Sequence, residues 1–308
     1  MKKYSPKTKE KLQELIKDES VYLGDIDTSA ISDMSHLFVC SGRKDFSGIS
    51  NWDVSKVKNM NTMFGACNSF NENIENWDIS SVEDIRFMFD YCYNFNQPLN
   101  KWNVSKIKKL VGVFEGCYSF NQPLNSWDVS NVENMSFLFL DCTSFNQPLN
   151  SWNTSKVTHM DETFMCCKAF NQPLNSWDVS NVVSMTSMFS GCRLFNQPLD
   201  SWNVSKVKEM NEMFSYCKKF NQSLNSWDVS SVEFMCCMFL KATSFDKSLD
   251  SWNVSRVKDF AWMFFGAKSF KQSLENWCIS KEARTIYMLD TKGLGTPPAY
   301  ILEGSISR

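Results

Sequence analysis

The sequence predicts an α/β repeat solenoid, a stack of about ten repeats of 25 residues that each hold a strand and a short helix. Trp recurs at a constant interval of 25 from Trp52 to Trp277. Two columns of Phe, which begin at Phe64 and Phe70, keep the same interval. Self-similarity at a fixed period indicates an architecture in which neighbouring repeats bury a face that no single repeat can bury alone.

The repeat that begins at Leu124 shows why these elements are expected. Leu124 and the Trp127-x-Val pattern alternate as in a strand, and their spacing resembles the L-x-x-L-x-L core of a leucine-rich repeat. Ser130 and Glu133 match a helix capping box. Apolar residues then recur over 132–142 at the spacing of one face of a short helix or a 3₁₀-rich arc. An Asn-Gln-Pro segment closes the repeat, because proline is excluded from central strands.

The two ends of the chain are expected to differ from the repeats. Residues 1–22 are predicted to form an N-terminal capping helix, with Ser5 as N-cap and Pro6 at its first position. A single repeat solenoid is predicted over 23–280. The periodicity decays after Trp277, so 281–308 are expected to form a C-terminal cap and an irregular tail.

Composition argues against several classes of partner. Of the 308 residues, 43% are hydrophobic and 21% are charged, and the formal net charge is −2. This balance gives no electrostatic reason to expect nucleic acid or an anionic membrane as the partner. The sequence shows no apolar signal-peptide core and no stretch of about 18 apolar residues, the length of a membrane span. A cytoplasmic location is therefore the expectation from sequence alone.

From Asp78 to Asn253 the residue after each repeat Trp alternates between Asp and Asn, and a basic residue three positions later accompanies only the Asn; the first repeat, with Asp53 and Lys56, breaks the rule. Like charges directly opposite each other on neighbouring strands are destabilising, so the alternation is first interpreted as a device for stacking without repulsion. In the functional interpretation, this polar strip lines the exposed strand face and meets a partner. The candidate partner-binding residues on it are Asp128, Asn153, Asp178, Asn203 and Asp228.

Cysteine and histidine give no indication of catalysis. Seven of the 12 cysteines follow the 25-residue period, and we interpret them as small buried core residues. On stacked helices they would lie about 8–10 Å apart, too far for disulfide bonds. His36 and His159 have no metal-ligand spacing, and no glycine-rich phosphate loop occurs. We therefore expect no enzyme, no catalytic residue, no metal and no cofactor. A recurring Asn, as in Asn121, is expected to satisfy loop backbone groups.

With these motifs the chain resembles the BspA-like leucine-rich-repeat surface proteins of bacteria. One branch carries repeats of the form F-N-Q-P-L-x-x-W-x-V-S-x-V-x-x-M-x-x-M-F-x-x-C, and residues 170–192 match it almost throughout. The resemblance covers roughly residues 20 to 280. It implies association with the bacterial surface and adhesin-like binding of host or matrix proteins. Surface members generally carry a signal peptide or a lipid-attachment cysteine, and neither pattern is found here.

Two hypotheses follow. The first is a non-catalytic protein-binding module, adhesin-like or scaffolding, that recognises a protein or other macromolecule through the exposed strand face. The second is a purely structural solenoid inside the cell that associates with itself. The first predicts a macromolecular partner without turnover, and the second predicts association that depends on concentration.

Overall fold

The computed structural model describes residues 2–289 of the chain, which forms two compact units, Met1–Lys156 and Val157–Arg308. We refer to them as unit 1 and unit 2. Three helical elements occur among the described residues, all in unit 1: α1 (Lys9–Lys17), η1 (Leu23–Asp25) and η2 (Ile49–Asn51). Residues 290–308, most of the predicted C-terminal cap and tail, lie outside the described part. No helix in the described part is long and apolar enough to cross a membrane.

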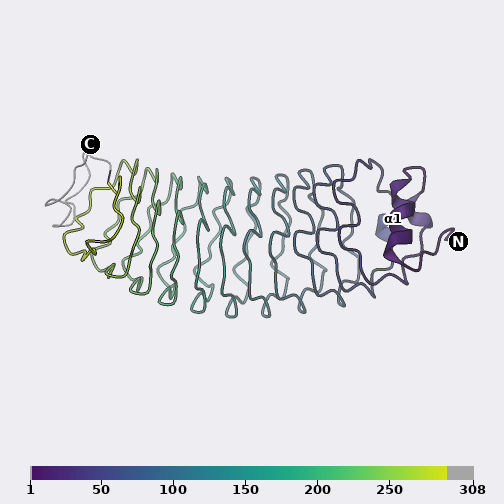
Figure 1. Cartoon of the computed structure of the whole chain (residues 1–308), viewed down its shortest axis with the longest axis horizontal. Coiled ribbons are helices and arrows are strands. Elements are labelled where there is room, and N and C mark those ends of the chain that lie inside the picture. The colour runs from purple at the N-terminus through teal and green to yellow at the C-terminus, as the bar shows by residue number, and fades with distance from the viewer. Residues whose placement is uncertain (1, 290–308) are drawn as a thin grey trace. The chain divides into compact units, whose positions relative to one another are not determined.

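The N-terminal helix exists but begins later than predicted. The prediction of Ser5 as N-cap and Pro6 as first helical residue is wrong, because α1 begins after Thr8, whose hydroxyl accepts the backbone N–H of Lys11 at 3.4 Å. The residues before it are extended instead. The N–H of Tyr4 donates to the carbonyl of Asp25 at 3.1 Å, a β-type bond that a helix starting at residue 6 would disrupt. Figure 1 labels α1 at the N-terminal end of unit 1.

Within each unit, successive repeats run side by side and are joined by backbone hydrogen bonds (Figure 1). Four bonds join two repeats of unit 1: Leu110 N to Asn134 O (2.9 Å), Gly112 N to Ser136 O (3.1 Å), Phe114 N to Leu138 O (3.1 Å) and Gly116 N to Leu140 O (2.7 Å). We call residues 134–141, and the equivalent residues of the other repeats, the ladder segment. Of the two alternatives predicted for 132–142, the helix is wrong, whereas tight i→i+3 turns, as from Leu138 N to Met135 O at 3.2 Å, agree with a 3₁₀-rich arc. A helix would use these N–H groups within the segment, whereas here every second one is donated to the next repeat.

Left-handed residues bend the ladder segment. Phe137 (φ 62°) and Asp141 (φ 59°) take this conformation, and so do Glu162 and Cys166 at the equivalent positions of unit 2. Phe137 is the third residue of the tight turn closed by the bond from Leu138 N to Met135 O, at 3.2 Å. A non-glycine residue in this region costs about 1–3 kcal/mol and persists only where the surroundings fix it. The regular bonds between repeats provide that constraint.

The strand predicted at the Trp-x-Val pattern is also absent from the structure. Trp127 N donates to Leu124 O at 3.0 Å, and Val132 N donates to Val129 O at 2.9 Å, so this side of the repeat consists of consecutive tight turns. Among residues 2–289, pairing of the β type consists of isolated parallel bridges, as between Lys109 and Asn134 at the ladder segment and between Tyr4 and Ile26 near the N-terminus. Loss of both predicted elements removes the basis for an α/β assignment of the described repeats.

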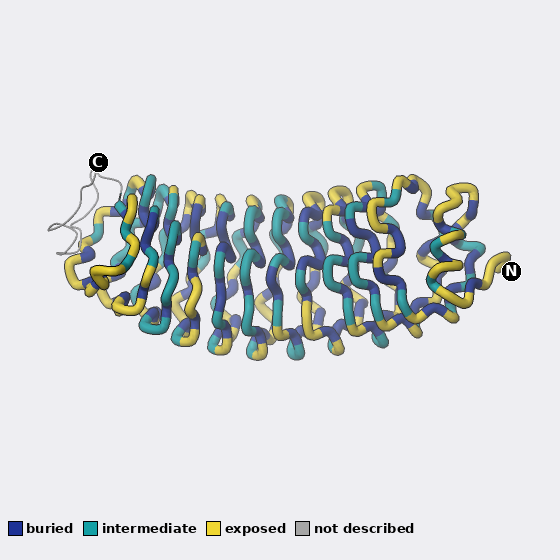
Figure 2. The backbone as a smooth tube through the Cα atoms, in the orientation of Figure 1, coloured by how far each residue is buried: buried dark blue, intermediate teal, exposed yellow. Residues whose placement is uncertain are grey.

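Stacked aromatic side chains form the core of each unit. Equivalent Phe rings of neighbouring repeats are parallel, with centroids 5.7 Å apart for Phe114 and Phe139 in unit 1. Each conserved Trp is almost fully buried, and its indole N–H donates to a carbonyl of the preceding repeat, as from Trp127 to Leu99 at 2.9 Å. Figure 2 shows that buried positions recur along every repeat. The predicted burial of the Trp and Phe columns is confirmed.

Candidate functional site

The five residues of the polar strip are exposed, and their side chains close local turns. The carboxylate of Asp128 accepts the backbone N–H of Ser130 at 3.0 Å, and Asn153 accepts that of Ser155 at 3.2 Å. Asp178, Asn203 and Asp228 make the same contact. The predicted capping box at Ser130 is wrong, since no helix begins there and the serine N–H serves this turn. Hydrogen bonds from Ser130 lower the pKa of Asp128.

Charge along this side of the repeats alternates in the structure as well. The ammonium group of Lys156 donates to the side-chain oxygen of Asn131 in the preceding repeat at 2.6 Å. Its positive charge also contributes to the lowered pKa of Asp128. Direct ion pairs between neighbouring repeats lie two residues further along, as between Lys108 and Glu133 at 3.7 Å. These contacts fit the interpretation of the alternation as a stacking device.

The periodic cysteines are buried free thiols, as predicted for core residues. Their S–H groups donate to Phe carbonyls of the preceding repeat, as from Cys117 to Phe89 at 3.1 Å. The predicted spacing of 8–10 Å rested on stacked helices that the repeats do not contain. Burial raises the pKa of Cys67 to about 12, so its thiolate is scarcely populated near neutral pH. These thiols are therefore poor candidates for nucleophiles or metal ligands.

The recurring asparagines form the predicted amide ladder. The side-chain oxygen of Asn96 accepts the backbone N–H of Asn121 at 2.9 Å and the side-chain amide of Gln122 at 3.0 Å. In unit 2 the backbone N–H of Asn221 donates to Asn196 in the same way, at 2.9 Å. The interpretation of this column as structural is confirmed, and these amides are already engaged within the stack.

The repeats differ from one another mainly along the exposed side of the ladder segment. We define the ladder face as the positions equivalent to residues 134, 136, 137, 140, 141 and 143. The position equivalent to Asp141 shows the variation: Ala66, Tyr91, Gly116, Asp141, Cys166, Gly191, Tyr216, Lys241 and Gly266. The inward positions equivalent to Met135 and Phe139 stay apolar and buried in the repeats from Met60 and Phe64 to Phe260 and Phe264. Sequence reasoning missed this face, although variation within an otherwise constant repeat was the signal that could have found it.

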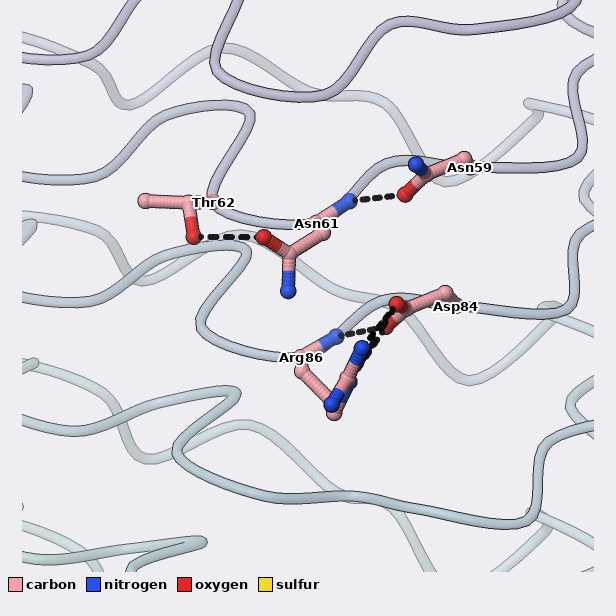
Figure 3. A network of polar contacts seen from close by, with 5 residues as sticks. All are labelled: Asn59, Asn61, Thr62, Asp84 and Arg86. Carbon is pink, nitrogen blue, oxygen red and sulfur yellow. Dashed lines mark hydrogen bonds and ion pairs between the residues drawn. The ribbon is translucent and has the colours of Figure 1, made fainter.

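Side chains at the start of the ladder segment hold its backbone in place (Figure 3). In one repeat of unit 1, Asn59 accepts the backbone N–H of Asn61 at 2.9 Å. In the next repeat, Asp84 accepts the backbone N–H of Arg86 at 3.0 Å and pairs with its guanidinium at 2.7 Å. The same local bond is thus made by different residue types. The identity of the outward side chain is left free to vary.

The ladder segments of unit 1 border an open hollow of about 700 Å³. Its basic lining residues are Arg86, Lys106, Lys108 and Lys109, with Glu83 and Asp84 among the acidic and polar ones. Lys108 pairs with Glu133 and Arg86 with Asp84. Among residues 2–289, no three His, Cys, Asp or Glu side chains come together in an arrangement that could hold a metal ion.

Comparison with protein families identifies the repeats. A family model described as "Mycoplasma protein of unknown function, DUF285" matches residues 9–124, 97–202 and 184–293. The chain belongs to this family. The three matches succeed one another along the chain and together span nearly all of it, as expected if the DUF285 signature is the tandem repeat itself. A search of curated proteins found no match.

Proposed function

We propose that this DUF285 protein is a non-catalytic binding module, built as a repeat solenoid, that recognises a protein partner through its ladder face. The observation that supports the proposal is that constant and variable positions lie on different parts of the repeat. Constant positions are used for the core, the amide ladder and the tight turns. Variable positions are gathered on one exposed side of consecutive repeats.

The variation itself supports binding over a purely structural role. A stack that needed only to hold itself together would tolerate the same residue at each exposed position, as the Asp and Asn of the polar strip illustrate. The ladder face instead presents Phe234, Trp262 and Tyr287 in unit 2 and Tyr91, Tyr93 and Tyr118 in unit 1. Aromatic residues are enriched at protein–protein interfaces, because they bury much area with few rotatable bonds.

The polar strip remains a second candidate surface. Its members are exposed but nearly identical from repeat to repeat, and each has a role in its own turn. A partner that met only this strip would face the same chemistry in every second repeat. The strip suits a repetitive ligand, whereas the ladder face suits a single specific partner.

The resemblance to BspA-like proteins extends the proposal to an adhesin-like role at the bacterial surface. Members of that group are associated with binding host or matrix proteins. Under this extension the ladder face meets an extracellular protein. Under the alternative, a scaffold inside the cell, the same face meets an intracellular protein or a second copy of the chain.

Site-specific photocrosslinking in the native cells tests the proposal. A benzophenone amino acid is placed at Tyr93 on the ladder face, at Asp128 on the polar strip, or at Pro123 in the return loop as a matched exposed control. Adducts with another protein from position 93 alone support the proposal. Adducts from position 128 alone move the site to the polar strip. Adducts only with the chain itself support the structural alternative, and an absence of adducts from all three positions refutes binding through either surface.

A further inference from the structure

Three tyrosines gather on the ladder face of unit 1. Tyr91, Tyr93 and Tyr118 are 38%, 36% and 40% exposed. The rings of Tyr93 and Tyr118 are stacked with centroids 4.8 Å apart and planes at 2°. The ring of Tyr91 stands perpendicular to that of Tyr93, with centroids 6.1 Å apart. The rings are fixed against one another, so the aromatic surface is organised before any partner arrives.

Carboxylates surround these rings. The negative charge of Glu115 is the main cause of a raised pKa at the Tyr91 phenol, and burial, followed by the charge of Asp141, raises the pKa of Tyr118. One carboxylate oxygen of Asp90 is buried and has no hydrogen-bond partner among the described residues. Burial and the charge of Glu115 together raise the pKa of Asp90 to about 7. The rings therefore lie in negative potential, to which Glu115 and Asp141 contribute.

Unit 2 contains a close counterpart that is already filled. Tyr216 occupies the position equivalent to Tyr91, and the next repeat places Lys241 over its ring, with the ammonium nitrogen 5.0 Å from the centroid. The same nitrogen donates to the Tyr216 hydroxyl at 3.2 Å. In unit 1 the position equivalent to Lys241 is Gly116. Unit 2 therefore forms a cation–π contact between neighbouring repeats at this position, whereas unit 1 has glycine in place of the lysine.

Gly116 also explains how the Tyr91 ring is held. A Cβ atom at Gly116 would lie 2.7 Å from the Tyr91 ring and 3.1 Å from its Cα, and Gly116 has a φ of +68°. Any larger residue would push the ring away. The glycine lets Tyr91 lie close against the next repeat, and the repeat that follows contributes Asp141 to the same side.

We propose that the tyrosine–carboxylate patch of unit 1, formed by Tyr91, Tyr93, Tyr118, Asp90 and Glu115, binds arginine or lysine side chains of a basic segment of the partner protein. The inference rests on the proposed function and names the partner's chemistry at one part of the ladder face. A cation over a tyrosine ring gains about 0.5–2 kcal/mol, depending on its desolvation. The neighbouring carboxylates add Coulomb attraction that salt screens. An anionic partner would be repelled by the same carboxylates.

Fluorescence anisotropy with the full chain tests the inference. The probe is a fluorescein-labelled peptide of four Gly-Ser-Arg repeats, and four Gly-Ser-Glu repeats serve as the matched acidic peptide. Saturable binding is expected for the basic peptide only, weakening as NaCl is raised. Replacing Tyr93 and Tyr118 together by Ala should weaken binding at least about fivefold, as expected for the loss of cation–π contacts. Glu115→Gln, which keeps the shape of the side chain, should weaken it about threefold at low salt.

The matched control variant is Tyr216→Ala. This tyrosine is 39% exposed and occupies the position equivalent to Tyr91, but its ring already faces Lys241. Peptide affinity should change less than twofold. Equal binding of the acidic and basic peptides, no saturable binding, or equal losses for the control and the patch variants would each overturn the inference. If crosslinks form at position 93 in cells while the basic peptide does not bind, the cationic partner is refuted and the proposed function stands. If crosslinks fail there, the proposed function itself is refuted.

Discussion

Replacing Trp202 by alanine tests the packing of unit 2 most directly. Trp202 is 3% exposed, its ring stacks at 6.3 Å on Trp227, and its indole N–H donates to the carbonyl of Leu174 at 2.9 Å. A buried Trp side chain removes about 150–250 Å² from water, which at about 25 cal/mol per Å² corresponds to roughly 4–6 kcal/mol. The Leu174 carbonyl also accepts the backbone N–H of Trp177 at 3.0 Å, so losing the indole donor removes one of its two hydrogen bonds and adds about 0.5–1.5 kcal/mol. The free energy of unfolding should therefore fall by about 5–7 kcal/mol.

A matched variant separates these two contributions. Trp202→Phe keeps an aromatic ring in the stack but removes the indole donor, so it should cost about 1–3 kcal/mol, from the lost hydrogen bond and the smaller buried ring. Urea unfolding followed by intrinsic fluorescence gives both values from the midpoint and the slope. Repeat arrays can unfold in parts, so a second probe, amide hydrogen exchange, is measured on the same variants. A loss below about 1 kcal/mol for Trp202→Ala would mean that this column is not the core, and the packing argument would fail.

Three further predictions follow from individual residues. Gly116→Ala should lower the free energy of unfolding by about 2–3 kcal/mol, because Gly116 has a left-handed backbone and lies close to the Tyr91 ring. Gly42→Ala is the control: a Cβ there would have nothing within 4 Å, so the free energy should change by less than about 0.5 kcal/mol. Urea unfolding measures both. In the folded protein Asp90 has a pKa of about 7, above its value in the unfolded chain. Its contribution to the free energy of unfolding is therefore fully present below about pH 4 and is lost as the pH rises through 7. Asp90→Asn should therefore raise the melting temperature at pH 8 and leave it nearly unchanged at pH 4; an equal change at both would contradict the burial of this charge. Cys40 and Cys278 are exposed and should react with a thiol reagent in the native protein. The buried periodic cysteines should react only when the protein unfolds. Fast labelling of all 12 thiols in the native protein would refute the burial of these cysteines.

The DUF285 family match and the structure together show a tandem-repeat protein whose core and outward positions differ in how much they vary. The core is nearly the same in every repeat, so mutations there report on stability. The ladder face differs between repeats, so exchanging its side chains between repeats, glycine positions excepted, should change the outward surface more than the core. This separation makes the photocrosslinking and peptide experiments interpretable without large effects on folding.

The sequence by itself determined the period, the buried columns and the amide ladder. Tandem repetition brings equivalent residues of neighbouring repeats into contact. The contact of Trp127 with the preceding repeat and the pairing of Asn121 with Asn96 could therefore be expected without knowing the backbone path. The exposure of the polar strip was also predictable, because polar residues alternate there with buried ones. The ladder face was not predicted, because the constant positions define the repeat and the face consists of the positions that vary.

Only the tertiary structure decided the local conformation. The apolar spacing over 132–142 fits a helix, yet the backbone N–H groups there bond to the next repeat, and no local pattern reveals a bond across 24 residues. The left-handed positions carry Phe137, Glu162 and Ser187 in some repeats and glycine, as at Gly112 and Gly116, in others, so the usual sequence signal for such a bend is only intermittent. Because a residue in this conformation is strained unless its neighbours fix it, stacking against the adjacent repeat, and not the residue type, selects the turn over the helix.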